Sequence, residues 1–183
     1  GGSITARDCT DRSFWVNDGS AGGQATISGT TQMSPYERLL SVEQPTGHGA
    51  EAPVRALRGK KATVVDFGPV IRNEFTICSV TRYTGGIKWR ILNGGGQNWL
   101  HGHGGAKAGV AYYRGWKTSR MAGSVSPNTD WVVMCGTNAG SQLKLVNGVD
   151  VGTASGGLGG VSLWINGGNY MPGAGSDFAI AEL

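Results

Sequence analysis

The chain has few acidic residues, few cysteines and no long apolar run, and each shortage excludes a class of protein. Its 183 residues include twelve Asp and Glu against sixteen Lys and Arg, and only three Cys. No apolar stretch approaches the roughly 20 residues that a membrane-spanning helix needs. Three cysteines are too few for a disulfide-dense secreted scaffold. The composition therefore indicates a globular chain with a net charge of +4.

Two of the three cysteines, Cys78 and Cys135, fall inside apolar strand patterns, whereas Cys9 stands apart near the start of the chain. Buried free thiols are the plainer interpretation of Cys78 and Cys135, because free cysteine packs as a small apolar side chain. The alternative is a disulfide across neighbouring strands, which would leave Cys9 without a partner.

Glycine, in contrast to cysteine and the acidic residues, is abundant in this chain. The chain has 33 glycines, and they separate short runs rich in Val, Ile, Thr and Trp, which is typical of many tight turns between many strands. The only helical pattern is a turn or two at 34–40. We therefore predict an all-β fold, with one domain over 1–183 and a less regular part over 1–60.

The most informative segment is Leu143–Gly152, which reads as strand, two-residue turn and strand. The central Asn147-Gly148 pair suits a type I′ hairpin, because both central residues of that turn need a positive φ. Further strands are expected at intervals of 8–15 residues, as in a sandwich or barrel. They are expected at 14–16, 25–27, 38–42, 63–67, 75–83, 89–92, 99–103, 109–113, 115–118, 131–135, 161–165 and 178–183. The run 131–135 is apolar throughout, which predicts a central strand covered on both faces.

Four motifs in order along 61–183 carry a resemblance to a known family. They are Phe75–Val80; Asn98–His103 with Gly109–Tyr113; Asp130–Val133 with Leu143–Gly148; and Asp177–Glu182. In this order they resemble laminin-G-like domains of the concanavalin A-like lectin/glucanase superfamily, of the type found in uncharacterised algal and protist proteins. The resemblance implies a jelly-roll β-sandwich of two antiparallel sheets.

The resemblance also implies a range of functions, since such domains bind glycans, proteins or steroids or serve as structural modules. Calcium is the usual cofactor of the family, held by oxygen ligands from loops at the rim. Asp130, Asn138 and Asp150 are the candidate ligands here, although ordinary Asx turns explain the same residues. The family's last strand usually continues past the point where this chain ends at Leu183, so we expect a segment of something longer. A secreted, cell-surface or organelle-lumen location is expected in preference to a cytosolic one.

Catalysis is not expected from this sequence. Glycosidases place an acid and a second carboxylate on either side of one glycosidic bond, whereas Asp177 and Glu182 are five residues apart and would point to opposite faces of a strand. No Gly-x-Ser-x-Gly motif is present. His101 and His103 would face the same side of a strand and could bind a metal with His48 or Glu51, but a hydrogen-bonded histidine pair is commoner.

Aromatic and polar residues gather between 89 and 116, and this set is the candidate ligand site. It consists of Trp89, Asn98, Trp99, His101, His103, Tyr112, Tyr113 and Trp116. Sugar recognition needs an aromatic surface with nearby amides or charges, and the concave sheet or its loop rim could present both. Most aromatics in a sandwich fill the core, however, and we expect one of Tyr112 and Tyr113 inward and the other outward.

We therefore predict a non-catalytic recognition module that binds an acidic or neutral polysaccharide. The rival prediction is a structural subunit that docks on other proteins without binding sugar. A nucleic-acid partner is not expected, because the basic residues form no recognised binding motif, and a scattered positive charge is most often a solvated surface.

Overall fold

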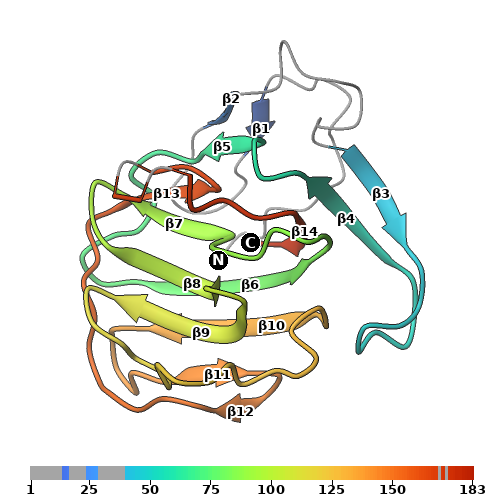
Figure 1. The fold of residues 1–183 in the computed structure, drawn as a ribbon. Coiled ribbons are helices and arrows are strands. Elements are labelled where there is room, and N and C mark those ends of the chain that lie inside the picture. Colours follow the sequence, from blue (N-terminus) through green and yellow to red (C-terminus); the bar gives the residue numbers. More distant parts are fainter. Residues whose placement is uncertain (1–13, 17–23, 29–39, 169, 172) are drawn as a thin grey trace.

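The computed structural model describes residues 14–16, 24–28, 40–168, 170–171 and 173–183 (Figure 1). The fold is all-β, as predicted, and consists of two antiparallel sheets that pack as a sandwich. Cys9 and most of the helical turn expected at 34–40 lie outside the described residues. No helix in the described part of the chain is long and apolar enough to cross a membrane.

Within the described ranges each sheet has seven strands, and every strand pair found in a sheet there is antiparallel. The first sheet has the order β1 (Phe14–Val16), β2 (Gln24–Ser28), β5 (Val64–Asp66), β13 (Ser162–Ile165), β7 (Leu92–Gly95), β8 (Trp99–Gly104) and β9 (Lys107–Tyr113). The second has the order β12 (Val149–Asp150), β11 (Lys144–Val146), β10 (Val132–Thr137), β6 (Thr76–Tyr83), β14 (Phe178–Glu182), β4 (Val54–Gly59) and β3 (Leu40–Gln44). Half of the neighbouring strand pairs are consecutive in sequence and half are not, because the chain passes repeatedly from one sheet to the other.

The main core lies between the two sheets, where alternate residues of each strand point inward. Leu92, Trp99 and Tyr113 enter it from the first sheet, and Met134 and Ile180 enter it from the second, all almost fully buried. A smaller apolar cluster of Ala56, Trp131 and Ala179 lies apart from this core. These residues alternate with core residues along the second sheet, so the small cluster covers part of that sheet's outer face.

The predicted Asn-Gly hairpin is present between β11 and β12. Asn147 has φ 48° and Gly148 has φ 83°, as a type I′ turn requires. The turn also supports its neighbour, since Asn147 Oδ1 accepts a hydrogen bond from the backbone N–H of Val133 at 2.9 Å. This bond ties the turn to β10.

Three expectations about the strands were wrong or incomplete, and one strand was not predicted. β10 is a central strand, flanked by β6 and β11, but its outer face is open, because Val133 is 49% exposed. The strand expected at 89–92 begins only at Leu92 and continues through glycines that were read as a turn. The segment 115–118 forms only an isolated bridge beside β9. β4 was not predicted, because a basic run obscured its alternation.

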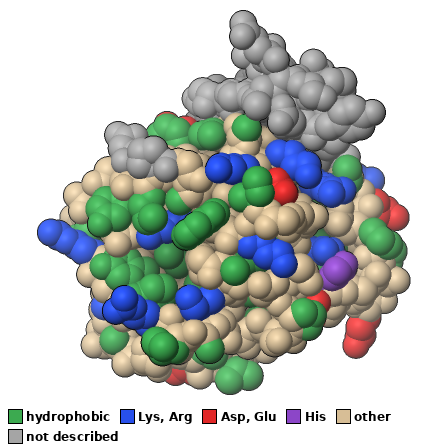
Figure 2. Space-filling model, viewed as in Figure 1, with side chains coloured by type: hydrophobic (Ala, Val, Ile, Leu, Met, Phe, Trp, Pro, Cys, Tyr) green, Lys and Arg blue, Asp and Glu red, His purple; other side chains and the backbone are tan. Residues whose placement is uncertain are grey.

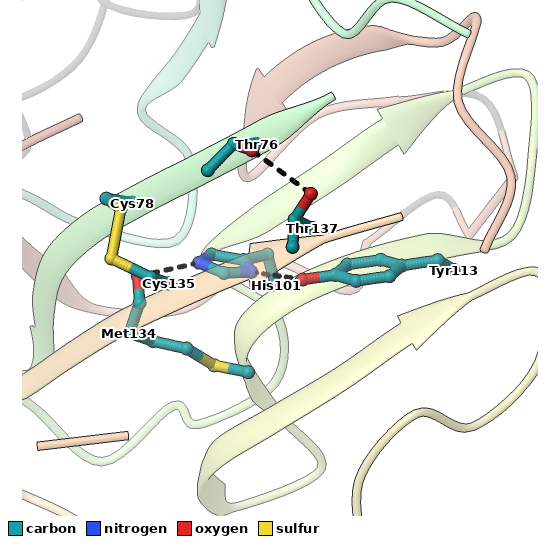
Figure 3. Close-up of a disulfide and its surroundings, with 7 residues drawn as sticks. All are labelled: Thr76, Cys78, His101, Tyr113, Met134, Cys135 and Thr137. Carbon is teal, nitrogen blue, oxygen red and sulfur yellow. Dashed lines mark hydrogen bonds between the residues drawn. A yellow bond between two sulfur atoms is a disulfide. The ribbon is translucent and has the colours of Figure 1, made fainter. Parts of the chain in front are cut away.

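Cys78 and Cys135 form a disulfide, so the free-thiol interpretation was wrong (Figure 3). The two residues are directly opposite each other on β6 and β10, with a Cα–Cα distance of 4.1 Å. Cys78 is exposed and Cys135 half-buried, which places the bond on the outer face of the second sheet. Disulfides persist in oxidising compartments, so this bond favours a location outside the cytosol.

Candidate functional site

The outer face of the first sheet carries a line of side chains that runs across four neighbouring strands. Residues directly opposite each other in an antiparallel pair point to the same face. The register pairs Trp164 of β13 with Asn93 of β7, Asn93 with Leu100 of β8, and Leu100 with Tyr112 of β9. Trp116 continues the line, because it bridges to Tyr112. We call these five residues the aromatic row.

The neighbouring residues confirm that the row faces outward. Ile165, Leu92 and Ala111 each adjoin a row residue along their strand, and all three lie in the core between the sheets. Adjacent strands are about 4.8 Å apart, so the three steps from Trp164 to Tyr112 span about 14 Å. Asn93 and Leu100 are each only 3% exposed, so a ligand on this face would contact mainly the half-buried Trp164 at one end and Tyr112 and Trp116 at the other. A ligand that reaches both ends has to be extended.

The aromatic end of the row lies at the edge of the sheet. Tyr112 and Trp116 meet edge to face, with ring centroids 5.4 Å apart, and both are half-buried. The segment carrying Trp116 is fixed against β9, because Thr118 Oγ1 accepts a hydrogen bond from the Ala111 N–H at 3.0 Å. The two rings are therefore held in a defined arrangement with part of their surface open to solvent.

Polar groups lie beside the rings at the middle of the row. The Arg90 guanidinium donates to Asn98 Oδ1 at 2.8 Å and more weakly to Asn93 Oδ1 at 3.4 Å. Burial lowers the pKa of Arg90, and interactions with Tyr170 and Tyr112 oppose that shift. The guanidinium is therefore positioned close to two tyrosines, on a surface that offers cationic and amide groups as well as rings.

The charge around the aromatic row is positive in character. Hydrophobic side chains and Lys or Arg cover the face over β7, β8 and β9, and among the coloured residues no Asp or Glu is visible there in this view (Figure 2). Such a surface favours neutral or acidic ligands over cationic ones. It does not favour nucleic acid in particular, because the basic residues are interspersed with apolar ones.

Four of the predicted ligand-binding residues are core residues instead. Trp99, His101 and His103 are fully buried, and Tyr113 is 1% exposed. The Tyr112/Tyr113 expectation is thereby confirmed, with Tyr113 inward and Tyr112 on the outer face. The four buried side chains cannot meet a ligand on the surface of the folded protein.

The hydrogen bonds of His101 show how the core accommodates it (Figure 3). Nε2 lies 3.2 Å from the Met134 carbonyl, which can only accept, so Nε2 carries the proton. Nδ1 then accepts from the Tyr113 hydroxyl at 2.6 Å. Burial lowers the pKa of His101 to about 4, against a smaller opposing effect of the Met134 carbonyl. The imidazole is thus neutral and links the two sheets.

The hydrogen bonding of the buried His103 is less complete than that of His101. Its Nδ1 lies 3.3 Å from Thr81 Oγ1, and its ring meets the Tyr83 ring edge to face at 4.5 Å. Nε2 has no hydrogen-bond partner among the described residues. Burial, and secondarily the nearby His101, lower the pKa of His103 to about 3. His101 and His103 are buried, whereas His48 and Glu51 lie in the exposed segment before β4. The structure does not bring these four residues together as a metal site.

The remaining predicted residues separate into two groups. Asn98, Tyr112 and Trp116 lie on or beside the aromatic row. Trp89 is 51% exposed but takes no part in the registered line, and its backbone is fixed by a hydrogen bond from its N–H to Ser176 Oγ at 2.8 Å.

The three candidate calcium ligands are not brought together. Asp130 and Asn138 lie beyond opposite ends of β10, eight residues apart, which corresponds to about 26 Å along a strand. The Asn138 side-chain amide is already hydrogen-bonded within the protein, since it accepts from the Phe75 N–H and donates to two backbone carbonyls. Asp150 accepts from the Gly152 N–H in an Asx turn. Among the described residues no group of three or more His, Cys, Asp or Glu could hold a metal.

Sequence reasoning missed Trp164 and Asn93 as members of the site, and it noted Arg90 only as a cation interleaved with the aromatic set. A signal for Trp164 was available, because Val161, Leu163 and Ile165 alternate and so predict an outward Trp164. Asn93 carried no such signal, since it precedes three glycines in a stretch typical of a turn. Arg90 reaches the row only through its long side chain, which a strand pattern does not reveal.

Comparisons with known proteins give no assignment: no family model, no curated protein and no solved structure matches this chain.

Proposed function

We propose that this protein is a non-catalytic recognition module that binds polysaccharide along the aromatic row. The observation that carries the proposal is the placement of Trp164, Tyr112 and Trp116, all partly exposed, along one registered line on one outer face. Aromatic rings offer flat apolar surface to the C–H faces of a pyranose, and amides and a guanidinium offer hydrogen bonds to its hydroxyls or carboxylates. Both kinds of group occur together here.

A kinship with laminin-G-like domains of the concanavalin A-like superfamily is part of the proposal. It is supported by the fold class and by the places of the four sequence motifs, which fall on β6, on β8 and β9, on β10 and β11, and on β14. The exposed disulfide supports a secreted, cell-surface or organelle-lumen location in particular. The proposal does not require calcium, because the candidate ligands do not converge, and the experiment therefore measures binding both with and without it.

The test is binding of the purified protein to a panel of neutral, uronic and sulfated glycans, with calcium and then with a chelator. We expect at least one polysaccharide to bind, and Trp116→Ala to weaken that binding at least tenfold. Trp89→Ala is the matched control, since it removes a half-exposed tryptophan outside the aromatic row. Equal losses in both variants would contradict the placement of the site. A folded protein that binds no glycan would overturn the proposal in favour of a protein-docking subunit.

A further inference from the structure

A second surface, on the opposite sheet, is hollowed by a pocket. An open pocket of about 570 Å³ lies where the segment before β10 meets the β11–β12 turn. Its lining includes Ser124, Ser126, Asp130, Trp131, Val133 and Asn147. Because Val133 points away from the core, the pocket belongs to the outer face of the second sheet. It shares no residue with the aromatic row.

Asp130 supplies the only charge among the residues that line this pocket. Its side chain is 23% exposed, and its nearest ionisable neighbour is His48, with Nδ1 3.8 Å from Oδ1. That distance is too long for a hydrogen bond. Within the described chain, the Asp130 carboxylate thus retains acceptor capacity that a ligand could use.

Trp131 supplies the opposite kind of group. The side chain is 6% exposed, and its indole Nε1 is buried with no acceptor among the described residues. An unpaired buried donor costs stability, so a structure that retains one invites an explanation. Trp131 is among the residues that line the pocket, so an oxygen atom of a ligand bound there is the acceptor that would satisfy this donor.

The surrounding charges select the kind of ligand. The Arg82 guanidinium lies 5.7 Å from the centre of the Trp131 ring. Burial and the charge of Arg58 lower the pKa of Arg82, and the charge of Asp130 opposes that shift. A cation in the pocket would therefore meet the field of Arg82, and an anion would meet Asp130. A hydroxyl group avoids both penalties, because it is neutral and can donate to Asp130 and accept from Trp131.

We infer that this pocket binds a neutral, hydroxyl-bearing ligand such as a single sugar unit, with Asp130 accepting from a hydroxyl and the Trp131 indole donating to a hydroxyl oxygen. Val133 and the Trp131 ring supply apolar surface for the carbon skeleton. The inference is independent of polysaccharide binding by the aromatic row. A protein that failed at one site could still bind at the other.

The test is a titration of the ¹⁵N-labelled protein, followed through the indole N–H resonances. The Trp131 signal is identified by its loss in Trp131→Phe, which keeps an aromatic ring in place. The probes are glucose, galactose and mannose as neutral sugars, lysine amide as a cation and acetate as an anion. We expect at least one sugar to move the Trp131 signal saturably in the millimolar range, and Asp130→Ala to weaken that binding about tenfold.

Two controls keep the outcomes distinct. Trp116→Ala alters the aromatic row and should leave the sugar-induced shift of the Trp131 signal unchanged. Asp130→Ala is checked for folding through the unaffected signals of the core Trp99 indole, which donates to the Leu158 carbonyl. The inference is overturned if no sugar moves the Trp131 signal, or if lysine amide or acetate moves it as strongly as the sugars do.

Discussion

His101 and His103 show at the scale of single residues how a pattern typical of ligands can serve the interior instead. The two histidines alternate along β8 as metal ligands would, but their strand lies between β7 and β9 with its inward side chains under the second sheet. The Gly102 between them faces Thr81 closely enough that an added Cβ would lie 3.3 Å from its hydroxyl. Sequence alone could not distinguish these environments, because the covering strands β6 and β10 come from distant parts of the chain.

The buried histidines predict a loss of stability in acid. At and above about pH 7 both imidazoles are mainly neutral in the folded and unfolded chain, so their full contribution is present. As the pH falls below 6.5, the unfolded chain binds protons that the folded chain excludes down to about pH 4 at His101 and about pH 3 at His103. The free energy of unfolding should therefore fall with a slope approaching about 2.7 kcal/mol per pH unit for two protons.

This slope is measured by urea denaturation between pH 7.5 and pH 4. His103→Gln should remove close to half of the slope, whatever it does to stability at neutral pH. His48→Gln is the control, because His48 lies at the surface beside Asp130 with 45% of its side chain exposed. A wild-type stability that stays constant down to pH 4 would show that the buried imidazoles do not resist protonation.

Asn166 is a second residue whose role depends on tertiary contacts. Its side chain donates to the carbonyls of Lys60, Thr63 and Ser176 and accepts from the Ser176 N–H at 2.8 Å. Asn166→Ala would leave these buried groups unpaired, which should lower the free energy of unfolding by about 3 kcal/mol. Asn128→Ala, which removes a more exposed amide that donates to a single carbonyl, should cost about 1 kcal/mol. Equal losses in denaturant unfolding would contradict the ranking.

At the scale of strands, local patterns predicted several elements, including β6, β13 and β14, whose neighbours in the sheet are distant in sequence. The β11–β12 hairpin followed from the Asn-Gly turn, and β6, β8, β9, β13 and β14 followed from alternation. The predicted bounds of β7 were wrong because the glycines after Asn93 are typical of a turn. In the sheet, Gly94 and Gly95 leave room for the Trp99 and Trp164 side chains. That requirement comes from neighbouring strands, which no window of sequence contains.

The link between β6 and β10 carries its own prediction. The Cys78–Cys135 disulfide joins residues 57 positions apart, and closing a loop of that length restricts the unfolded chain by about 4 kcal/mol. The double variant Cys78→Ser, Cys135→Ser should lose a comparable amount of stability in denaturant unfolding. Reductant should reproduce the loss in the wild type and have no effect on the double variant.

The counting of free thiols in the unfolded, non-reduced protein provides the check. We expect modification of Cys9 alone in the wild type, because the other two cysteines are bonded. Modification of all three would show that the bond does not form.

At the scale of the whole molecule, the two sheets turn different surfaces outward. The first sheet presents the aromatic row, and the second presents the disulfide and the pocket at Asp130 and Trp131. The sequence predicted the sandwich and a cluster of aromatic and polar residues, but it could not divide that cluster into core and surface. The division follows from strand register, which places Trp99 inside and Tyr112 outside although both belong to the same hairpin.

The measurement that tests the account most directly is calorimetric titration with oligosaccharides of increasing length, cut from the polysaccharide that the panel identifies. Because the aromatic row spans about 14 Å over four strands, affinity should rise from the disaccharide to the tetrasaccharide and then level off. In Trp116→Ala the affinity for the longer chains should fall at least tenfold, and the gain with length should shrink. An affinity that does not depend on length, and that Trp116→Ala leaves unchanged, would contradict the assignment of the aromatic row as the binding surface.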